Sequence, residues 1–206
     1  NGTVYFIFQP DEEKTQGAQA MIDDGLFEKF SIDEVYAFHN LPGMEVGSFA
    51  TRSGTITASE SLFNIKLWGQ GGHSALPHMG VDTITVGTQI ITSLQSIVSR
   101  KLNPAMNGVV SVTKFESDGN ENILPGHSII SGDARALSPE ANKIIEDSMR
   151  NIVEGIANAH GIKFEFTYDT RTNMTINTTD QAAFASKVAE DLVGTDNVDG
   201  NCDPKL

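Results

Sequence analysis

Two glutamates and a histidine are the residues of this sequence whose types and positions best suit catalytic chemistry. Glu12 and Glu13 follow residues 4–8, whose β-branched and aromatic side chains are typical of a buried strand, and Pro10, which ends a ladder. His39 comes at the end of a second short apolar segment. Divalent metals bind carboxylate and imidazole ligands, and a carboxylate beside an activated water can move its proton. The alternative is an acidic surface turn with a histidine at a strand end.

A second group of polar residues lies in the middle of the chain. His73 follows Gly71 and Gly72, and glycines before a histidine allow the backbone to approach a ligand closely. The amide of Asn122 could donate to an oxyanion, and Arg135 could form paired hydrogen bonds with a carboxylate. The alternative for His73 is a flexible loop, for Asn122 it is a loop hydrogen bond, and for Arg135 it is a surface salt bridge.

The first group can act together only if the two strand ends meet at one edge of a sheet. Residues 15–30 carry apolar side chains at helical spacing, and residues 35–39 form the second apolar segment. This order predicts a strand–helix–strand unit with parallel strands, which places both strand ends at the edge where open α/β sheets hold their ligands. The fold class predicted for this part is α/β.

From about residue 59 the pattern changes to alternating apolar and polar residues. Phe63, Ile65 and Leu67 alternate in a first strand, and the order that follows is βαββαβ, typical of an α+β ferredoxin-like sandwich. We expect an inserted ferredoxin-like lid and dimerisation domain at 59–170, and a partial catalytic α/β domain at 1–58 and 171–206. Beyond the first strand, helices are predicted at 82–101, 138–159 and 179–193, and strands at 109–115, 128–135 and 162–168.

Composition narrows the classes of partner. The chain has 206 residues, 14 basic and 27 acidic, and a formal net charge of -13. Nucleic acid and anionic membranes favour basic surfaces, so neither is expected as a partner. Cys202 is the single cysteine, which excludes an internal disulfide and fits a reducing compartment. We expect a cytoplasmic bacterial protein, and the strand-like beginning and loop-like end suggest an internal fragment.

Five stretches of the sequence share one resemblance. They are Phe8-Gln-Pro-Asp-Glu-Glu, Ala37-Phe-His-Asn-Leu-Pro-Gly, Gly69-Gln-Gly-Gly-His-Ser-Ala-Leu-Pro-His-Met-Gly-Val-Asp, Ile97-Val-Ser-Arg and Asn122-Ile-Leu-Pro. Together they resemble the aminoacylase/carboxypeptidase G metallopeptidase family over nearly the whole chain. The nearest branch is the N-acyl-amino-acid amidohydrolases, which include hippurate hydrolase and the plant auxin-conjugate hydrolases.

The resemblance implies a two-metal amidohydrolase that acts on N-acyl amino acids with zinc, manganese, nickel or cobalt. Glu12 matches the general base, and Glu13 and His39 match metal ligands. Asp11 stands where this branch often has alanine, which should not disturb the ligands. The family also has an upstream cysteine or acid, histidines in a Gly-His-Asp-type motif and a histidine near the C-terminus, and these do not occur among the 206 residues. The piece alone is therefore expected to bind metal poorly and to be inactive, whereas its parent is expected to be active.

The resemblance also assigns roles in the lid. His73 matches a histidine that stabilises the oxyanion, often across a homodimer formed through the lid, and Asn122 and Arg135 match residues near the substrate carboxylate. Two other functions stay open. One is a non-catalytic dimerisation module that self-associates through the strand at 109–115. The other is a dipeptidase or carboxypeptidase of the same family.

Overall fold

The computed structural model describes residues 2–206, and the chain divides into two compact units. The first is Asn1–Val46 and the second is Gly47–Leu206. Each unit has its own local structure and is described by itself.

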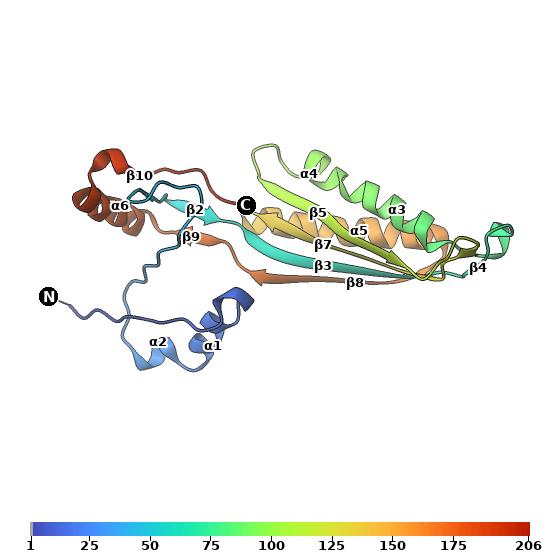
Figure 1. Ribbon diagram of the computed structural model, residues 1–206, viewed down its shortest axis with the longest axis horizontal. Coiled ribbons are helices and arrows are strands. Elements are labelled where there is room, and N and C mark those ends of the chain that lie inside the picture. The colour runs from blue at the N-terminus through green and yellow to red at the C-terminus, as the bar shows by residue number, and fades with distance from the viewer. Residues whose placement is uncertain (1) are drawn as a thin grey trace. The chain divides into compact units, whose positions relative to one another are not determined.

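The first unit contains three short helical elements. They are the 3-10 helix η1 (Glu12–Lys14), α1 (Gly17–Asp23) and α2 (Leu26–Lys29) (Figure 1). A single helix was predicted over residues 15–30. It is interrupted at Gly25, whose φ of 87° lies in the left-handed region that glycine adopts without steric cost.

The predictions of buried strands at 4–8 and 35–39, and of a parallel pair between them, are wrong for the described residues. No strand is assigned within residues 2–46. The exposed fractions of Val4, Phe6 and Phe8 are 76%, 83% and 87%, whereas Tyr5 is 44% exposed and its ring lies 5.2 Å from that of Phe30. This alternation fits an extended chain. A strand also needs a neighbouring backbone for its hydrogen bonds, and local apolar pattern does not supply one.

The second unit is built around a four-stranded antiparallel sheet with the strand order β5-β7-β3-β8. Its strands are β3 (Ser59–Trp68), β5 (Gly108–Ser117), β7 (His127–Ala136) and β8 (Lys163–Thr172). Three helices lie along one face of it: α3 (Thr83–Leu94), α4 (Ser96–Arg100) and α5 (Pro139–His160) (Figure 1). The strand and helix order predicted for 59–170 is therefore present, with a break at Gln95 in the predicted helix 82–101.

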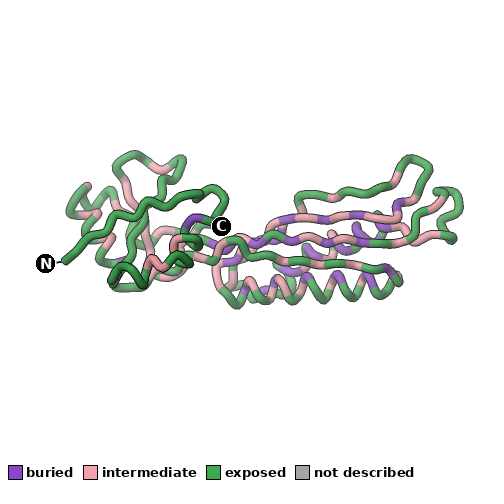
Figure 2. The backbone as a smooth tube through the Cα atoms, turned by 90° about the horizontal axis from the view of Figure 1, so that it is seen from below, coloured by how far each residue is buried: buried purple, intermediate pink, exposed green. Residues whose placement is uncertain are grey.

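The hydrophobic core lies between this sheet and its helices. Residues along β7 alternate between buried and partly exposed, and α5 buries one residue in every four (Figure 2). Both patterns follow from the side-chain periods of a strand and a helix. The fully buried large side chains include Phe63, Ile65, Leu67, Ile90, Leu94, Ile97, Ile130, Ile145, Met149 and Val153. Ser138 caps the start of α5 by accepting from the Ala141 amide, and Gly161 ends it in a left-handed conformation.

A two-stranded ribbon continues from one end of the sheet. Strand β2 (Gly54–Thr57) leads into β3, and β8 leads into β9 (Thr175–Asn177). Strands β2 and β9 pair with each other in antiparallel orientation. The register shifts between Thr55 and Thr57 and again between Glu60 and Ser61. Beyond the ribbon lie α6 (Thr179–Val193), η3 (Thr195–Asn197) and a parallel pair formed by β1 (Phe49–Ala50) and β10 (Val198–Asp199).

The helix predicted at 179–193 is confirmed by α6. The assignment of residues 171–206 to one domain with residues 1–58 stays a prediction. Among the described residues, none of the helices combines the length and the apolar character that crossing a membrane requires.

Candidate functional site

The acidic turn of the first unit has an unusual backbone. Asp11 and Thr15, which flank η1, have φ values of 49° and 58°, in the left-handed region that side chains other than glycine seldom occupy. Such conformations gather at functional sites, where the surrounding structure holds them. The acidic turn packs closely against Gly17, which is buried. A Cβ on Gly17 would lie only 1.5 Å from the carbonyl oxygen of Pro10. The turn therefore sits directly on the first residue of α1.

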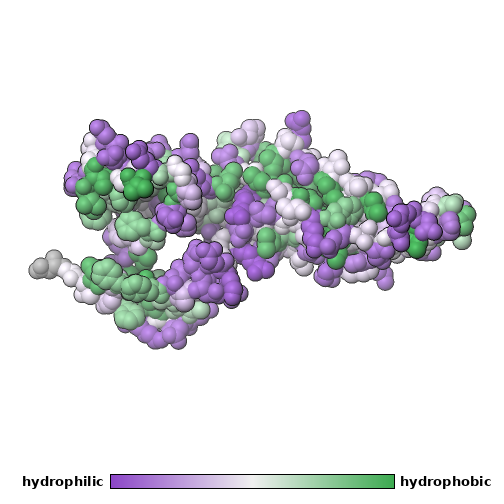
Figure 3. Space-filling view, viewed as in Figure 1, coloured by the Kyte–Doolittle hydropathy of each residue, from purple (hydrophilic) through white to green (hydrophobic). Residues whose placement is uncertain are grey.

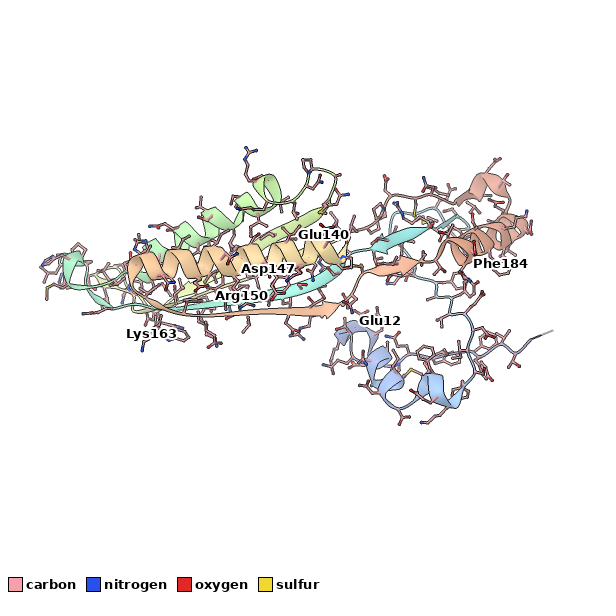
Figure 4. The ribbon with its side chains drawn as sticks, turned by 180° about the vertical axis from the view of Figure 1, so that it is seen from behind. Glu12, Glu140, Asp147, Arg150, Lys163 and Phe184 are labelled. Carbon is pink, nitrogen blue, oxygen red and sulfur yellow. The ribbon has the colours of Figure 1, made fainter. Side chains whose placement is uncertain are left out.

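This packing leaves the paired acids at the surface of their unit. Glu12 and Glu13 are both exposed on η1, and Figure 4 shows Glu12 at that element. Two carboxylates at consecutive positions of one turn diverge, so they can take different roles. One can bind a metal ion while the other accepts a proton.

His39 is held in a form suited to binding a metal. Its Nδ1 lies 2.7 Å from the carbonyl oxygen of Asn40. A carbonyl oxygen can only accept, so the proton of the neutral ring resides on Nδ1, and Nε2 keeps a free lone pair. Metal-binding histidines are commonly oriented in this way, by a carbonyl group that accepts from the other ring nitrogen.

The donor chemistry of these residues fits a divalent metal ion. Glu13 offers carboxylate oxygens and His39 offers an imidazole nitrogen, the ligands that zinc and related ions bind. Within residues 2–206, three or more His, Cys, Asp or Glu side chains do not gather closely enough to hold a metal ion.

The second unit brings His73 and Asn122 together at the far end of the sheet. Strand β4 (Gly72–His73) pairs with β6 (Ile123–Leu124), although their sequences lie some fifty residues apart (Figure 1). The amide of Ser74 donates to the carbonyl of Asn122 at 3.0 Å, which extends the pairing by one step. Sequence patterns indicated a plain loop at each of these positions, because two-residue strands leave no detectable periodicity.

The loop that carries His73 is closed at its base. Gln70 and Val81 exchange backbone hydrogen bonds of 3.0 and 2.8 Å, and the Gln70 side chain donates to the Met79 carbonyl at 3.0 Å. Gly71 lies so close to the opposite segment that a Cβ there would be 2.9 Å from the Leu124 carbonyl oxygen. We name residues 69–81 and 118–126 together the lid tip.

Nδ1 of His73 accepts a hydrogen bond, whereas Nδ1 of His39 donates one. The amide of Ala75 donates to Nδ1 of His73 at 3.0 Å. An amide nitrogen can only donate, so Nδ1 carries the lone pair and the proton of the neutral ring resides on Nε2. Nε2–H is then a donor, which is what stabilisation of an oxyanion requires. Sequence analysis missed this role of Ala75, because its contribution is a backbone group and not a side chain.

Arg135 lies near the opposite end of β7 from the lid tip. It is eight residues from His127, or about 27 Å along an extended strand. Its guanidinium donates to Asp133 at 2.9 Å and to Glu60 at 2.6 Å. The hydrogen bond with Asp133 is the main cause that raises the pKa of Arg135. Within one chain, therefore, Arg135 is not brought together with His73 and Asn122.

Comparison with known proteins shows the family of the chain. The model of peptidase family M20/M25/M40 matches residues 1–204. Hippurate hydrolase of Campylobacter jejuni is 38% identical over 206 residues, which is all of this chain and 54% of that protein. N-acetylcysteine deacetylase of Bacillus subtilis is 36% identical over 165 residues, covering 80% of this chain and 43% of the relative.

Solved structures give the same result. The Bacillus subtilis YxeP protein, described as a dinuclear metal binding peptidase of the M20 family, matches with a TM-score of 0.76 and 28% identity. The match covers 97% of this chain and 49% of YxeP. A protein from methicillin-resistant Staphylococcus aureus matches with a TM-score of 0.82 and 27% identity, over 92% of this chain and 49% of that structure.

The chain belongs to peptidase family M20/M25/M40, a family of hydrolases with a mixed α/β fold. Its relatives are named for hydrolysis of hippurate and of N-acetylated amino acids. The chain spans about half the length of the curated relatives it matches.

Proposed function

We propose that the full-length protein is a metal-dependent amidohydrolase that cleaves N-acyl amino acids. The observation that supports this proposal is a pair of histidines whose Nδ1 atoms make hydrogen bonds of opposite direction. His39 keeps the lone pair on Nε2 that a metal ligand needs, and His73 keeps the Nε2–H that an oxyanion stabiliser needs. Family membership and the names of the relatives give the reaction class.

In the proposed mechanism each of these residues has one task. Glu13 and His39 would hold divalent ions, and such ions would supply a more acidic water and a polarised substrate carbonyl. Glu12 accepts the proton of the attacking water and later gives it to the leaving amine. Nε2–H of His73 donates to the oxyanion of the tetrahedral intermediate.

Two further residues of the second unit are proposed to bind the substrate carboxylate. Asn122 would donate its amide from the lid tip of one copy of a dimer, and Arg135 would act from the other copy, because one chain does not bring the two residues together. Arg135 already binds Asp133 and Glu60, yet it retains N–H donors because a guanidinium has five. We also propose that zinc, manganese, nickel or cobalt is the metal and that the protein works in the bacterial cytoplasm. Residues 1–206 alone are proposed to be inactive and to bind metal poorly.

The test is the substitution Glu12→Gln in the full-length protein. Glutamine keeps the size of the side chain but cannot accept the proton, so we expect kcat to fall by roughly 10²–10⁴-fold with metal content unchanged. Glu28→Gln, on α2 of the same unit, is the matched control and should retain full activity. A near-normal rate in Glu12→Gln would falsify the assignment of the general base.

We propose in addition that the protein is a homodimer that pairs through β5. This strand is at an edge of the sheet and presents unpaired backbone groups. It contacts α3, and no charged residue occurs from position 83 to 99 in a chain that carries 41 such residues. Ile84 and Val98 are partly exposed there. These features fit a second copy better than they fit solvent.

The same surface supports a second candidate function, a dimerisation module without catalysis. Light scattering of the eluting protein, combined with metal analysis and assays on hippurate, separates the two. A dimer that binds metal and hydrolyses hippurate supports the enzyme, whereas a dimer with neither property supports the module. Hydrolysis of dipeptides in place of N-acyl amino acids would instead indicate a peptidase of the family.

A further inference from the structure

Three large apolar side chains are exposed around His73 at the lid tip. Leu76, Met79 and Ile123 have exposed fractions of 50%, 63% and 50%. Figure 3 shows apolar surface at this end of the second unit, among polar atoms. Exposed apolar side chains grouped in this way mark a surface that contacts another molecule.

Strand pairing places Ile123 directly beside His73. The two residues are register partners in the β4–β6 pair. Opposite residues of an antiparallel pair have side chains on the same face, with Cβ atoms roughly 4.5–5.5 Å apart. The imidazole that is proposed to bind the oxyanion therefore has an exposed isoleucine as its cross-strand neighbour.

Backbone hydrogen bonds hold the other two apolar residues in the same loop. The amide of Leu76 donates to the His73 carbonyl at 2.8 Å, and the amide of Met79 donates to the Leu76 carbonyl at 3.0 Å. Asn122 precedes Ile123 and lies in a tight turn, which is closed by backbone hydrogen bonds of 3.1 Å between Asn120 and Ile123. His73 therefore has an apolar neighbour across the strand pair, Ile123, and two exposed apolar residues in its own loop, Leu76 and Met79.

We infer that Ile123, with Leu76 and Met79, contacts the acyl group of the substrate and selects large apolar acyl groups over acetyl. This inference rests on the proposed role of His73. The oxygen that His73 would hold belongs to the carbonyl of the acyl group. The rest of that group is bonded to the same carbonyl carbon, so it lies close to the imidazole. An apolar wall next to the imidazole is in a position to bury a benzoyl ring but finds little to bury in acetyl.

The test compares two substrates that differ only in their acyl group, N-benzoylglycine and N-acetylglycine. For Ile123→Ala in the full-length, metal-loaded protein, we expect the ratio of kcat/KM for benzoyl over acetyl to fall about tenfold. The kcat/KM for N-acetylglycine should fall less than that for N-benzoylglycine, because acetyl has little apolar surface to bury. Ile176→Ala removes an isoleucine with 55% exposure on β9, away from the lid tip, and should leave the ratio unchanged.

Each outcome decides the inference. An unchanged ratio, or an equal fall with both substrates, would overturn the role of Ile123 while the proposed function stands. A loss of dimer in Ile123→Ala without a change in the ratio would assign the residue to the subunit interface and also overturn it. If the wild-type protein hydrolyses neither substrate, the proposed function fails first. Met79→Ala is a second variant, and it should lower the same ratio.

Discussion

Gly71 and Gly72 are adjacent, yet the structure predicts very different consequences of adding a methyl group to each. A Cβ on Gly71 would lie 2.9 Å from the Leu124 carbonyl oxygen and 3.2 Å from the Gly126 amide nitrogen. A Cβ on Gly72 would have no atom within 4 Å. Neither residue has a positive φ, so alanine fits both backbones and only the contact differs.

The size of the effect follows from the distances. Ordinary contact begins near 3.4 Å, so Gly71→Ala must move the Leu124 segment by 3.4 − 2.9 = 0.5 Å or give up the pairing of β4 with β6. Overpacking of this kind costs about 1–3 kcal/mol, which corresponds to a Tm lowered by ~2–12 °C in a chain of this size. Gly72→Ala should be neutral or slightly stabilising, because alanine reduces the entropy of the unfolded chain.

Two measurements check the prediction. Thermal unfolding gives the difference in Tm between the two variants, and amide exchange of Ser74 reports whether its hydrogen bond to Asn122 persists. In the full-length protein, displacement of His73 by about half an ångström should lower kcat/KM about tenfold in Gly71→Ala. If the two variants unfold at the same temperature and protect Ser74 equally, the close approach at Gly71 does not hold the lid tip together.

Two other substitutions test the four-stranded unit. A Cβ on Gly132 would lie 2.1 Å from the Ser111 carbonyl oxygen and 2.4 Å from the Phe63 ring. Gly132→Ala should therefore lower the free energy of unfolding, measured by denaturant titration, by about 3 kcal/mol or more. A loss below about 1 kcal/mol would contradict this packing. Burial is the main cause that raises the pKa of Tyr168 above its ordinary value of 10.0. The folded state therefore favours the neutral phenol, its contribution to stability is complete below pH 10, and it is lost as the pH rises through the raised pKa. Tyr168→Phe should remove this alkaline loss, and an identical decline above pH 10 in both proteins would refute the assignment.

Local sequence pattern predicted the helices and strands that pack against other elements of the second unit. The helix at 179–193 was predicted with its observed bounds, and Ser138 with Pro139 marked the start of α5 correctly. Strands β3 and β8 follow the predicted alternation because one face meets the helices and the other meets solvent. In each case the main packing contacts lie within the second unit.

The pairing of residues 4–8 and the hydrogen bonds of the two histidines depend on contacts that local sequence pattern does not encode. Residues 4–8 have the composition of a strand, but a strand exists only when a second backbone pairs with it. The proton positions of His39 and His73 are set by a carbonyl of Asn40 and an amide of Ala75, and backbone groups are present at every position of a sequence. Residue types therefore indicated which side chains to consider, and the fold determined which of their atoms can act.

The pairing of β3 with β8 fixes the distance between the two ends of the four-stranded sheet. These strands are the first and last of the four-stranded unit, and they run antiparallel from Trp68 opposite Lys163 to Glu60 opposite Thr172. The chain therefore enters and leaves the unit about 5 Å apart, the spacing of neighbouring strands. A host protein can receive such an insertion at any surface hairpin without its own ends being forced apart.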